Sequence, residues 1–296
     1  MRTLTGLGVA MITPFSKDFK IDYAAAERLV EHLIAGGTDF LLALGTTGEP
    51  ATLSEQERAD YLRFVIERTN GRKPVIVGVG GNNTQAVVDA IAKLPKSGIE
   101  AVLSVAPYYN KPTQRGIIQH FKTIAQHSHL PIIVYNVPGR TGVNMTADTT
   151  LELAHSERNI VAVKEASGNI SQMGYILRDR PKDFVVLSGD DNLLLPELAI
   201  GADGVISVFG NAFPQHFARL IALAREQRYP EAAVLHGQLL HFIDLLFAEG
   251  NPCGIKAAMT CLGIAQNVLR LPLVPISDTL MQKMQREVDA LSAISA

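Results

Sequence analysis

Eight short apolar runs, rich in valine, isoleucine and leucine, recur between residues 8 and 209 and alternate with longer helical patterns. They are hydrophobic almost throughout rather than at every second position, which is typical of parallel strands buried on both faces. The expected strands are residues 8–15, 39–45, 74–80, 101–107, 131–138, 160–167, 183–189 and 204–209. A chain with this pattern has to cover both faces of its sheet, and this requirement restricts the fold more than any other feature of the sequence.

The segments between the first strands are amphipathic, and several begin with residues that cap helices. Ser54 and Glu57 form a capping box ahead of an apolar stripe, which predicts a helix start. Thr84 and Thr113 are the expected caps of the next two helices. Helices therefore alternate with strands along this part of the chain.

Eight strands separated by helices predict an α/β fold, a (β/α)8 TIM barrel. A doubly wound sheet is the competing fold, but it usually has fewer strands and a glycine-rich turn after the first, where this chain has ITPF. Beyond about residue 212 only helical patterns follow, at 231–249, 254–263 and 277–293. We expect residues 1–224 to form the barrel with the active site and residues 225–296 to form a C-terminal helical appendage packed on it.

Composition excludes several classes of protein for this 296-residue chain. A formal net charge of −2 supplies no basic field for a polyanion, so we expect no nucleic acid partner. No stretch approaches the ~20 apolar residues that cross a bilayer, and no segment has the pattern of a signal peptide. Cys253 and Cys261 lie eight residues apart in a helical segment, about 12 Å along its axis, too far for a disulfide. These features predict a reduced, cytoplasmic protein without membrane association.

The unusual polar residues gather where the expected strands end. Barrel enzymes place their active sites at the carboxyl ends of the strands, in the loops that lead to the helices. The segments at these ends are GTTGE (45–49), GVGGNN (78–83), PYYNKP (107–112), YNVPGRTG (135–142), KEASGN (164–169), SGDD (188–191) and SVFGN (207–211). We expect the site to be built from them.

Lys164 is the most informative of these residues because it ends the apolar run NIVAVK. Charged side chains are rarely buried without a partner. A free lysine has a pKa of ~10.4, so only about one in 2500 is neutral at pH 7. Burial lowers that pKa and frees a lone pair for attack on a carbonyl. The alternative is a lysine that reaches solvent from the strand end or pairs with Glu165, and Lys164 alone does not decide between the two.

Tyr135 and the pair Thr46 and Thr47 strengthen the Schiff-base interpretation. Tyr135 ends the preceding strand and is therefore expected beside Lys164, where a phenol can relay protons. Gly45 and Gly48 flank the two threonines and allow a tight turn whose amides and hydroxyls can converge on a small carboxylate. Each signal has an ordinary structural explanation, a core tyrosine or a common turn, and only their combination favours catalysis.

We expect no metal site in this chain. His127 and His129 resemble a ligand pair, yet they precede the fifth expected strand and so lie on the rim opposite the site. Asp190 and Asp191 could bind a cation, but no third ligand is evident near them in the sequence.

GTTGE, PYYNKP, YNVPGRTG, VAVKEASG and LSGDD, in this order at the strand ends, resemble the 4-hydroxy-tetrahydrodipicolinate synthase (dihydrodipicolinate synthase) family of class I pyruvate-dependent aldolases. The resemblance covers the whole chain, from GVAMITPF to the helical tail with NPCGIKAAM. It implies condensation of pyruvate with L-aspartate 4-semialdehyde on the route to lysine and diaminopimelate, without a metal or an organic cofactor. It also implies at least a dimer, and a dimer of dimers by similarity to the family.

The resemblance assigns roles to eight residues. Lys164 would form the imine with pyruvate, and Tyr135, Thr46 and Tyr109 would form a proton relay, with Tyr109 supplied by a neighbouring subunit. Thr47 and the backbone near Ile206 would hold pyruvate, and Arg140 would bind the carboxylate of the incoming aldehyde, with Gly189 nearby. These are the catalytic set Lys164, Tyr135, Thr46 and Tyr109 and the substrate-binding set Thr47, Arg140, Gly189 and Ile206.

Two other functions compete with the synthase. Another pyruvate-dependent lyase, such as an N-acetylneuraminate lyase or a 2-keto-3-deoxy sugar acid aldolase, shares the lysine, the tyrosine and the threonine turn. Such lyases tend to lack the arginine of VPGRTG, which this chain has as Arg140. A non-catalytic barrel that senses a small acid is the third possibility, but binding alone needs no buried amine nucleophile.

The chain departs from its lysine-inhibited relatives at the expected effector pocket. It has Glu55 and Arg58 where those relatives often carry histidines or similar ligands, Pro50 in place of a small polar residue and Ala86 in place of an acid. We therefore predict weak or absent feedback inhibition by L-lysine. An inhibition curve measures this, and a steep fall in activity at submillimolar L-lysine would contradict the prediction.

Overall fold

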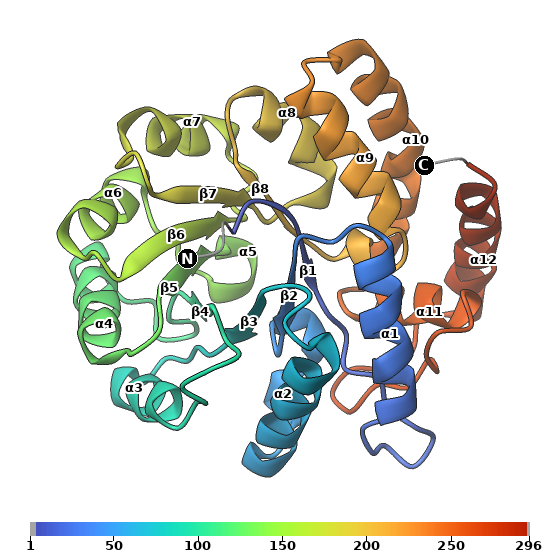
Figure 1. Cartoon of the computed structure of the whole chain (residues 1–296), viewed down its shortest axis with the longest axis horizontal. Coiled ribbons are helices and arrows are strands. Elements are labelled where there is room, and N and C mark those ends of the chain that lie inside the picture. Colours follow the sequence, from blue (N-terminus) through green and yellow to red (C-terminus); the bar gives the residue numbers. More distant parts are fainter. Residues whose placement is uncertain (1–3, 295–296) are drawn as a thin grey trace.

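The computed structural model describes residues 4–294 and shows a closed barrel of eight parallel strands in the order of the sequence. Figure 1 shows the strands at the centre with helices around them. The strands are β1 (Gly6–Ala10), β2 (Phe40–Ala43), β3 (Val75–Gly78), β4 (Ala101–Val105), β5 (Ile132–Asn136), β6 (Ile160–Glu165), β7 (Val185–Ser188) and β8 (Gly204–Ser207). The predicted (β/α)8 fold is confirmed, although β1 begins two residues earlier than expected and most strands are shorter.

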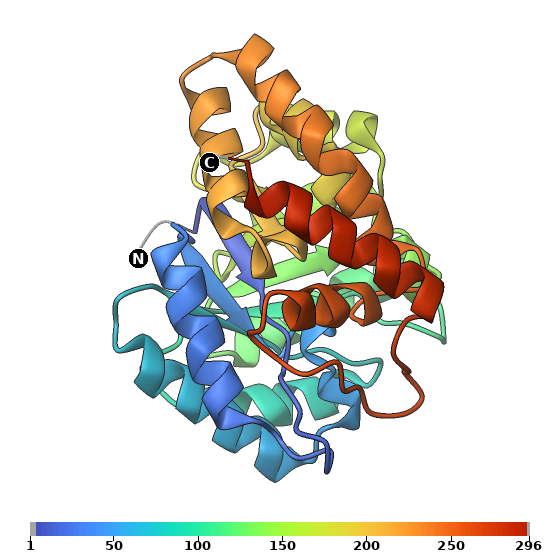
Figure 2. The ribbon, with the colours of Figure 1, turned by 90° about the vertical axis from the view of Figure 1, so that its right-hand side faces the viewer.

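The helices surround the barrel and then continue as a C-terminal group. They are α1 (Tyr23–Ala35), α2 (Glu55–Thr69), α3 (Thr84–Ala92), α4 (Gln114–His127), α5 (Pro138–Thr141), α6 (Ala147–Ser156), α7 (Ile170–Asp179), α8 (Leu194–Ala199), α9 (Pro214–Arg225), α10 (Tyr229–Phe247), α11 (Cys253–Cys261) and α12 (Asp278–Ser292). The last three contact one another and lie on one side of the barrel, the side that faces the viewer in Figure 2. The expected boundary near residue 224 falls in the last turn of α9. The division into a barrel at 1–224 and a helical appendage at 225–296 stays a prediction.

Helix caps follow the sequence signals in two of three cases. Ser54 and Glu57 form the predicted capping box of α2, and the Thr113 hydroxyl accepts from the Gly116 N–H at the start of α4. The prediction for Thr84 is wrong. The preceding residue, Asn83, caps α3, and its longer side chain reaches the Ala86 N–H at 3.2 Å. Asparagine and threonine adjoin here, and both residue types cap helices, so the sequence did not distinguish them.

The barrel has two apolar layers. Inside it, one cluster includes Ala10, Phe40, Ile133, Ala162 and Leu187, and a larger cluster packs the outer faces of the strands against the helices. Side chains alternate between these layers along each strand, so every strand is buried on both faces. This double burial is the physical reason for the near-continuous apolar runs in the sequence.

Glycine allows the barrel to close where its first and last strands meet. Gly6 pairs with Gly204, and a Cβ atom at Gly204 would lie 2.1 Å from the carbonyl oxygen of Gly6. No side chain fits at that distance from backbone atoms.

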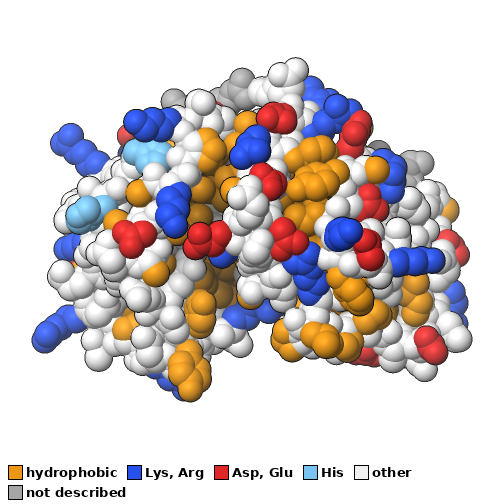
Figure 3. Space-filling view, turned by 90° about the horizontal axis from the view of Figure 1, so that it is seen from below, with side chains coloured by type: hydrophobic (Ala, Val, Ile, Leu, Met, Phe, Trp, Pro, Cys, Tyr) orange, Lys and Arg blue, Asp and Glu red, His pale blue; other side chains and the backbone are white. Residues whose placement is uncertain are grey.

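The described residues contain no helix long and apolar enough to cross a membrane. On the face shown in Figure 3, basic and acidic side chains are interspersed, and apolar side chains lie both in the central hollow and in patches beside it. Cys253 and Cys261 are both free thiols, as expected from their spacing.

Candidate active site

A cavity of about 290 Å³ opens at the carboxyl ends of the strands, where the sequence predicts the site. It contains polar side chains from five segments far apart in the chain. Its lining residues are Ala10, Leu42, Thr46, Thr47, Leu103, Tyr135, Val137, Gly139, Arg140, Lys164, Ala166, Gly189, Asp190, Asp191, Asn192, Val208, Phe247 and Asn251. The volume suits a small substrate such as a keto acid.

Strand alternation turns Lys164 toward this cavity. Ala162, two residues earlier in β6, belongs to the inner cluster, so the side chain of Lys164 also faces the inside of the barrel. It is only 5% exposed. The next residue, Glu165, points the other way and accepts hydrogen bonds from Asn136 and Gln172. Lys164 has no ion pair with Glu165 or with any other residue between 4 and 294, so the structural alternative raised for it does not hold.

The electrostatic surroundings of Lys164 favour its neutral form. Burial lowers the pKa of Lys164 to about 8, and the nearby cation of Arg140 acts in the same direction. The negative charges of Asp191 and Asp190 oppose this shift by favouring the ammonium form. Desolvation is the dominant influence, because none of these charges is close enough to form an ion pair with the amine.

Tyr135 lies directly beside Lys164, since the two residues pair across β5 and β6. The Nζ atom of Lys164 is 4.5 Å from the centroid of the Tyr135 ring. Burial raises the pKa of Tyr135 to about 12, while the charge of Arg140 and the side chain of Thr46 lower it. The phenol is therefore protonated at neutral pH, next to an amine that is partly neutral.

The turn at residues 45–49 presents the two threonines at the rim of the cavity. Thr46–Gly48 forms a single 3-10 turn, closed by a 2.8 Å hydrogen bond from the Gly48 N–H to the Gly45 carbonyl. Thr47 is buried, and its hydroxyl oxygen accepts a hydrogen bond from the Asn251 amide at 3.1 Å. The turn is held from two sides, since the hydroxyl of Thr13 also donates to the Gly48 carbonyl at 2.7 Å.

Of the remaining residues named from the sequence, two line the cavity and two do not. Arg140 lines it from α5, with an exposed side chain, and Gly189 lines it beside Lys164. Ile206 is buried in the inner cluster and is not a lining residue, although Val208, two residues later, is. Tyr109 does not line the cavity of this chain and is 89% exposed.

Several lining residues had no role assigned from the sequence, among them Asp191, Phe247 and Asn251. Asp191 is buried, and its carboxylate accepts the N–H groups of Val208 and Phe209 at 3.0 and 2.7 Å, which fixes the loop after β8. Burial raises the pKa of Asp191 to about 6. Phe247 and Asn251 come from the end of α10 and the connection to α11, so the C-terminal region forms one wall of the cavity. Only the NPCGIKAAM segment hinted at this contribution.

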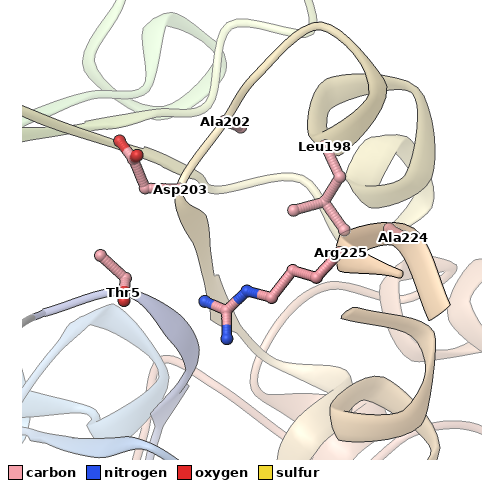
Figure 4. Close-up of a pocket in the computed structure, with 6 residues that line it drawn as sticks. All are labelled: Thr5, Leu198, Ala202, Asp203, Ala224 and Arg225. Atoms are coloured by element: carbon pink, nitrogen blue, oxygen red, sulfur yellow. The ribbon is translucent and has the colours of Figure 1, made fainter. Parts of the chain in front are cut away.

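The structure brings together no group of three or more His, Cys, Asp or Glu side chains that could hold a metal ion within residues 4–294. A second cavity lies at the opposite rim, between the chain entering β1 and β8 and the helices α8 and α9. Figure 4 shows Arg225 extended into it, with the carboxylate of Asp203 turned away. Its polar side chains belong to Thr5, Asp203 and Arg225, and none of them carries an amine that could form an imine with a keto acid.

Comparison with known proteins places this geometry in a family. Residues 3–291 match the model of the dihydrodipicolinate synthetase family. A 4-hydroxy-tetrahydrodipicolinate synthase of Phocaeicola vulgatus is 50% identical over 288 residues, which cover 97% of each chain. The crystal structure of dihydrodipicolinate synthase from Aquifex aeolicus superposes with a TM-score of 0.94 at 41% identity, over 98% of each chain. The chloride-inhibited synthase from Acinetobacter baumannii, solved in complex with pyruvate, superposes with a TM-score of 0.95 at 37% identity, over 99% of this chain and 100% of that one.

Gly189 provides a test of how closely the lysine is packed. A Cβ atom there would lie 2.9 Å from Cε of Lys164 and 2.5 Å from Cβ of Ala166. We predict that Gly189→Ala displaces the lysine and slows its reaction with a keto acid about 100-fold, because a shift of ~1 Å in a reacting group has an effect of that size.

Gly139→Ala is the matched control, because Gly139 lines the same cavity and a Cβ atom there meets nothing within 4 Å. The measurement is the rate at which borohydride and pyruvate together inactivate each variant. Equal rates for the two variants would contradict the prediction.

The family model and the relatives agree over almost the entire chain, and six of the eight residues named by the resemblance line the cavity. The chain belongs to the dihydrodipicolinate synthetase family.

Proposed function

We propose that Lys164 is the residue through which this chain carries out the reaction of its family. The family assignment makes the chain a lyase of the class I aldolase type. Its activity is the condensation of pyruvate with L-aspartate 4-semialdehyde to 4-hydroxy-tetrahydrodipicolinate. We assign the individual steps of this reaction to residues in and around the cavity.

The observation that carries the proposal is a buried, unpaired amine in the cavity of the barrel. With a pKa of about 8, roughly one Lys164 side chain in ten is neutral at pH 7, about 200 times more than for a free lysine. The neutral amine adds to C2 of pyruvate, and loss of water from the carbinolamine gives a protonated imine. Among residues 4–294, Lys164 is the only lysine that lines the cavity.

Proton transfer during these steps is assigned to Tyr135, with Thr46 beside it. The phenol starts protonated, so it can donate to the oxygen that leaves as water and later take a proton back. We assign the far end of the relay to Tyr109 of a neighbouring copy of the chain. Its exposed ring and its φ of 72°, unusual for tyrosine, are consistent with a side chain presented to a partner.

Substrate binding is assigned to groups on both sides of the lysine. The Thr47 hydroxyl and the backbone near Ile206 would hold the carboxylate of pyruvate. Arg140 would bind the carboxylate of the aldehyde, because a guanidinium fork can contact both oxygens of such a group. Gly189 would leave space for the aldehyde next to the lysine, since any side chain there meets Cε of Lys164.

The iminium makes the carbon–carbon bond possible. It withdraws electrons from the pyruvate methyl group, which loses a proton to give an enamine, and the enamine carbon attacks the aldehyde. The amino group of the joined product then displaces Lys164 from the imine carbon, which closes the ring and regenerates the free lysine. The covalent iminium takes the place of a metal's Lewis acidity, so this route uses no metal and no organic cofactor.

The two substrates distinguish the synthase from the alternative lyases. The relatives at high identity over nearly full length are named as synthases, which supports the main prediction over the sialic acid or sugar acid lyases. Arg140 at the rim of the cavity supports the same choice. A synthase is expected to turn over L-aspartate 4-semialdehyde with pyruvate and to show little turnover when sugar aldehydes replace it.

We also propose a homo-oligomer, a dimer of dimers, located in the cytoplasm. The role given to Tyr109 requires at least a second copy of the chain, because Tyr109 lies outside the cavity of its own copy. The two free thiols are consistent with a reducing compartment.

Reductive trapping tests the proposal directly. Borohydride added with pyruvate is expected to inactivate the enzyme permanently and to add the mass of the reduced adduct to the peptide that contains Lys164. Lys164→Met should abolish both effects, because the thioether has no amine. Labelling of another lysine, or turnover by Lys164→Met at the rate of the parent enzyme, would refute the assignment.

A further inference from the structure

A second buried lysine lies outside the chemistry described above. Lys256 in α11 is 0% exposed and forms an ion pair with Glu49, which is 3% exposed. Its Nζ atom also donates to the Val268 carbonyl at 2.9 Å and lies 4.0 Å from the centroid of the Phe15 ring. Neither member of this Glu49–Lys256 pair lines the cavity, so the pair does not contact a substrate there.

The Glu49–Lys256 pair joins two segments that do reach the cavity. Glu49 follows Thr47 by two residues, and Lys256 follows Asn251 by five. Between them, the Asn251 amide donates to the Thr47 hydroxyl oxygen at 3.1 Å, in a contact that is fully buried and spans 204 residues of sequence. The ion pair therefore links the two segments that carry the partners of this hydrogen bond.

Arg270 adds further contacts at this junction between the Glu49 segment and the C-terminal region. Its backbone N–H donates to the second carboxylate oxygen of Glu49 at 3.2 Å, and its guanidinium forms an ion pair with Glu57. The guanidinium carbon is 4.5 Å from the centroid of the Phe15 ring, which Lys256 also contacts. Glu49 thus contacts two parts of the C-terminal region.

The segment that contains Asn251 is also closely packed. A Cβ atom at Gly254 would lie 2.3 Å from the carbonyl oxygen of Leu246, so the start of α11 touches the end of α10. The connection between these helices, which contains Asn251, has little room to move between that contact and the ion pair. Buried ion pairs add little stability compared with apolar packing. The effect of the Glu49–Lys256 pair on the position of Asn251 is therefore more informative than its effect on stability.

We propose that the Glu49–Lys256 pair is a positioning device that holds the Asn251 amide against the Thr47 hydroxyl. With its oxygen accepting from Asn251, the hydroxyl is left to donate its own hydrogen to a carboxylate of the keto acid. The inference rests on the proposed function, because it takes Thr47 as a ligand of pyruvate. Lys256 is in this view a positioning residue, and Lys164 remains the nucleophile.

The test is a double-mutant cycle with Asn251→Ala and Lys256→Met, read as KM for pyruvate and kcat. Asn251→Ala is expected to raise KM about five- to tenfold, the effect of one lost hydrogen bond, with a smaller change in kcat. Lys256→Met is expected to raise KM by a similar factor and also to lower the Tm. If the lysine acts through the asparagine, the double variant has the KM of Asn251→Ala alone.

Arg180→Met is the matched control. It breaks an ion pair with Asp203 at the opposite rim of the barrel, so it should lower the Tm without changing KM for pyruvate. If Lys256→Met does not fold, Glu49→Gln replaces it in the cycle, since it removes the charge and keeps the shape of the side chain.

Two results would overturn the inference: an unchanged KM in Asn251→Ala, or KM increases that multiply in the double variant. Borohydride trapping of the parent enzyme tests the proposed function independently of the KM measurements. If pyruvate labels Lys164 and the KM values multiply, only the positioning role fails. If pyruvate does not label Lys164, the proposed function fails.

Discussion

The burial of the Lys164 amine, which forms no ion pair with any residue that the structure describes, is the constraint on which the site depends. Lys164 is placed among apolar side chains because a strand buried on both faces directs every second residue into the barrel. Water no longer stabilises its positive charge, and the two nearby carboxylates compensate only in part, so its pKa falls to about 8. The cost of burying the charge is the source of the reactivity, because it leaves a usable fraction of the amine neutral at physiological pH.

Burial alone does not select a nucleophile, as the second buried lysine shows. Burial lowers the pKa of Lys256 to about 8 as well, with the charge of Glu49 opposing the shift. Lys256, however, is held by its ion pair and by the Val268 carbonyl, and it does not line the cavity. Lys164 has space for a substrate in front of it and Tyr135 beside it. Access and a neighbouring proton donor, more than basicity, distinguish the two residues.

Much of the barrel and the centre of the site could be predicted from the sequence, because both follow from local patterns. Parallel strands in consecutive order put Tyr135 beside Lys164, and apolar runs locate the strands within a few residues. The wall formed by Phe247 and Asn251 was missed, since it depends on how helices 200 residues downstream pack on the barrel. No period or spacing in the sequence encodes that contact. Asp191 was expected near the site as part of SGDD, but its bonds to the loop after β8 become visible only once the barrel is closed.

The most direct measurement of the central claim is the pH dependence of the rate at which pyruvate and borohydride inactivate the enzyme. The neutral amine is the reacting form, and its fraction rises with pH until the pKa of the lysine is passed. With a pKa of about 8 for Lys164, the rate should rise roughly tenfold per pH unit below pH 7 and level off between pH 8 and 9. A rate that keeps rising tenfold per unit to pH 10 would show an ordinary, solvated lysine and would contradict the account.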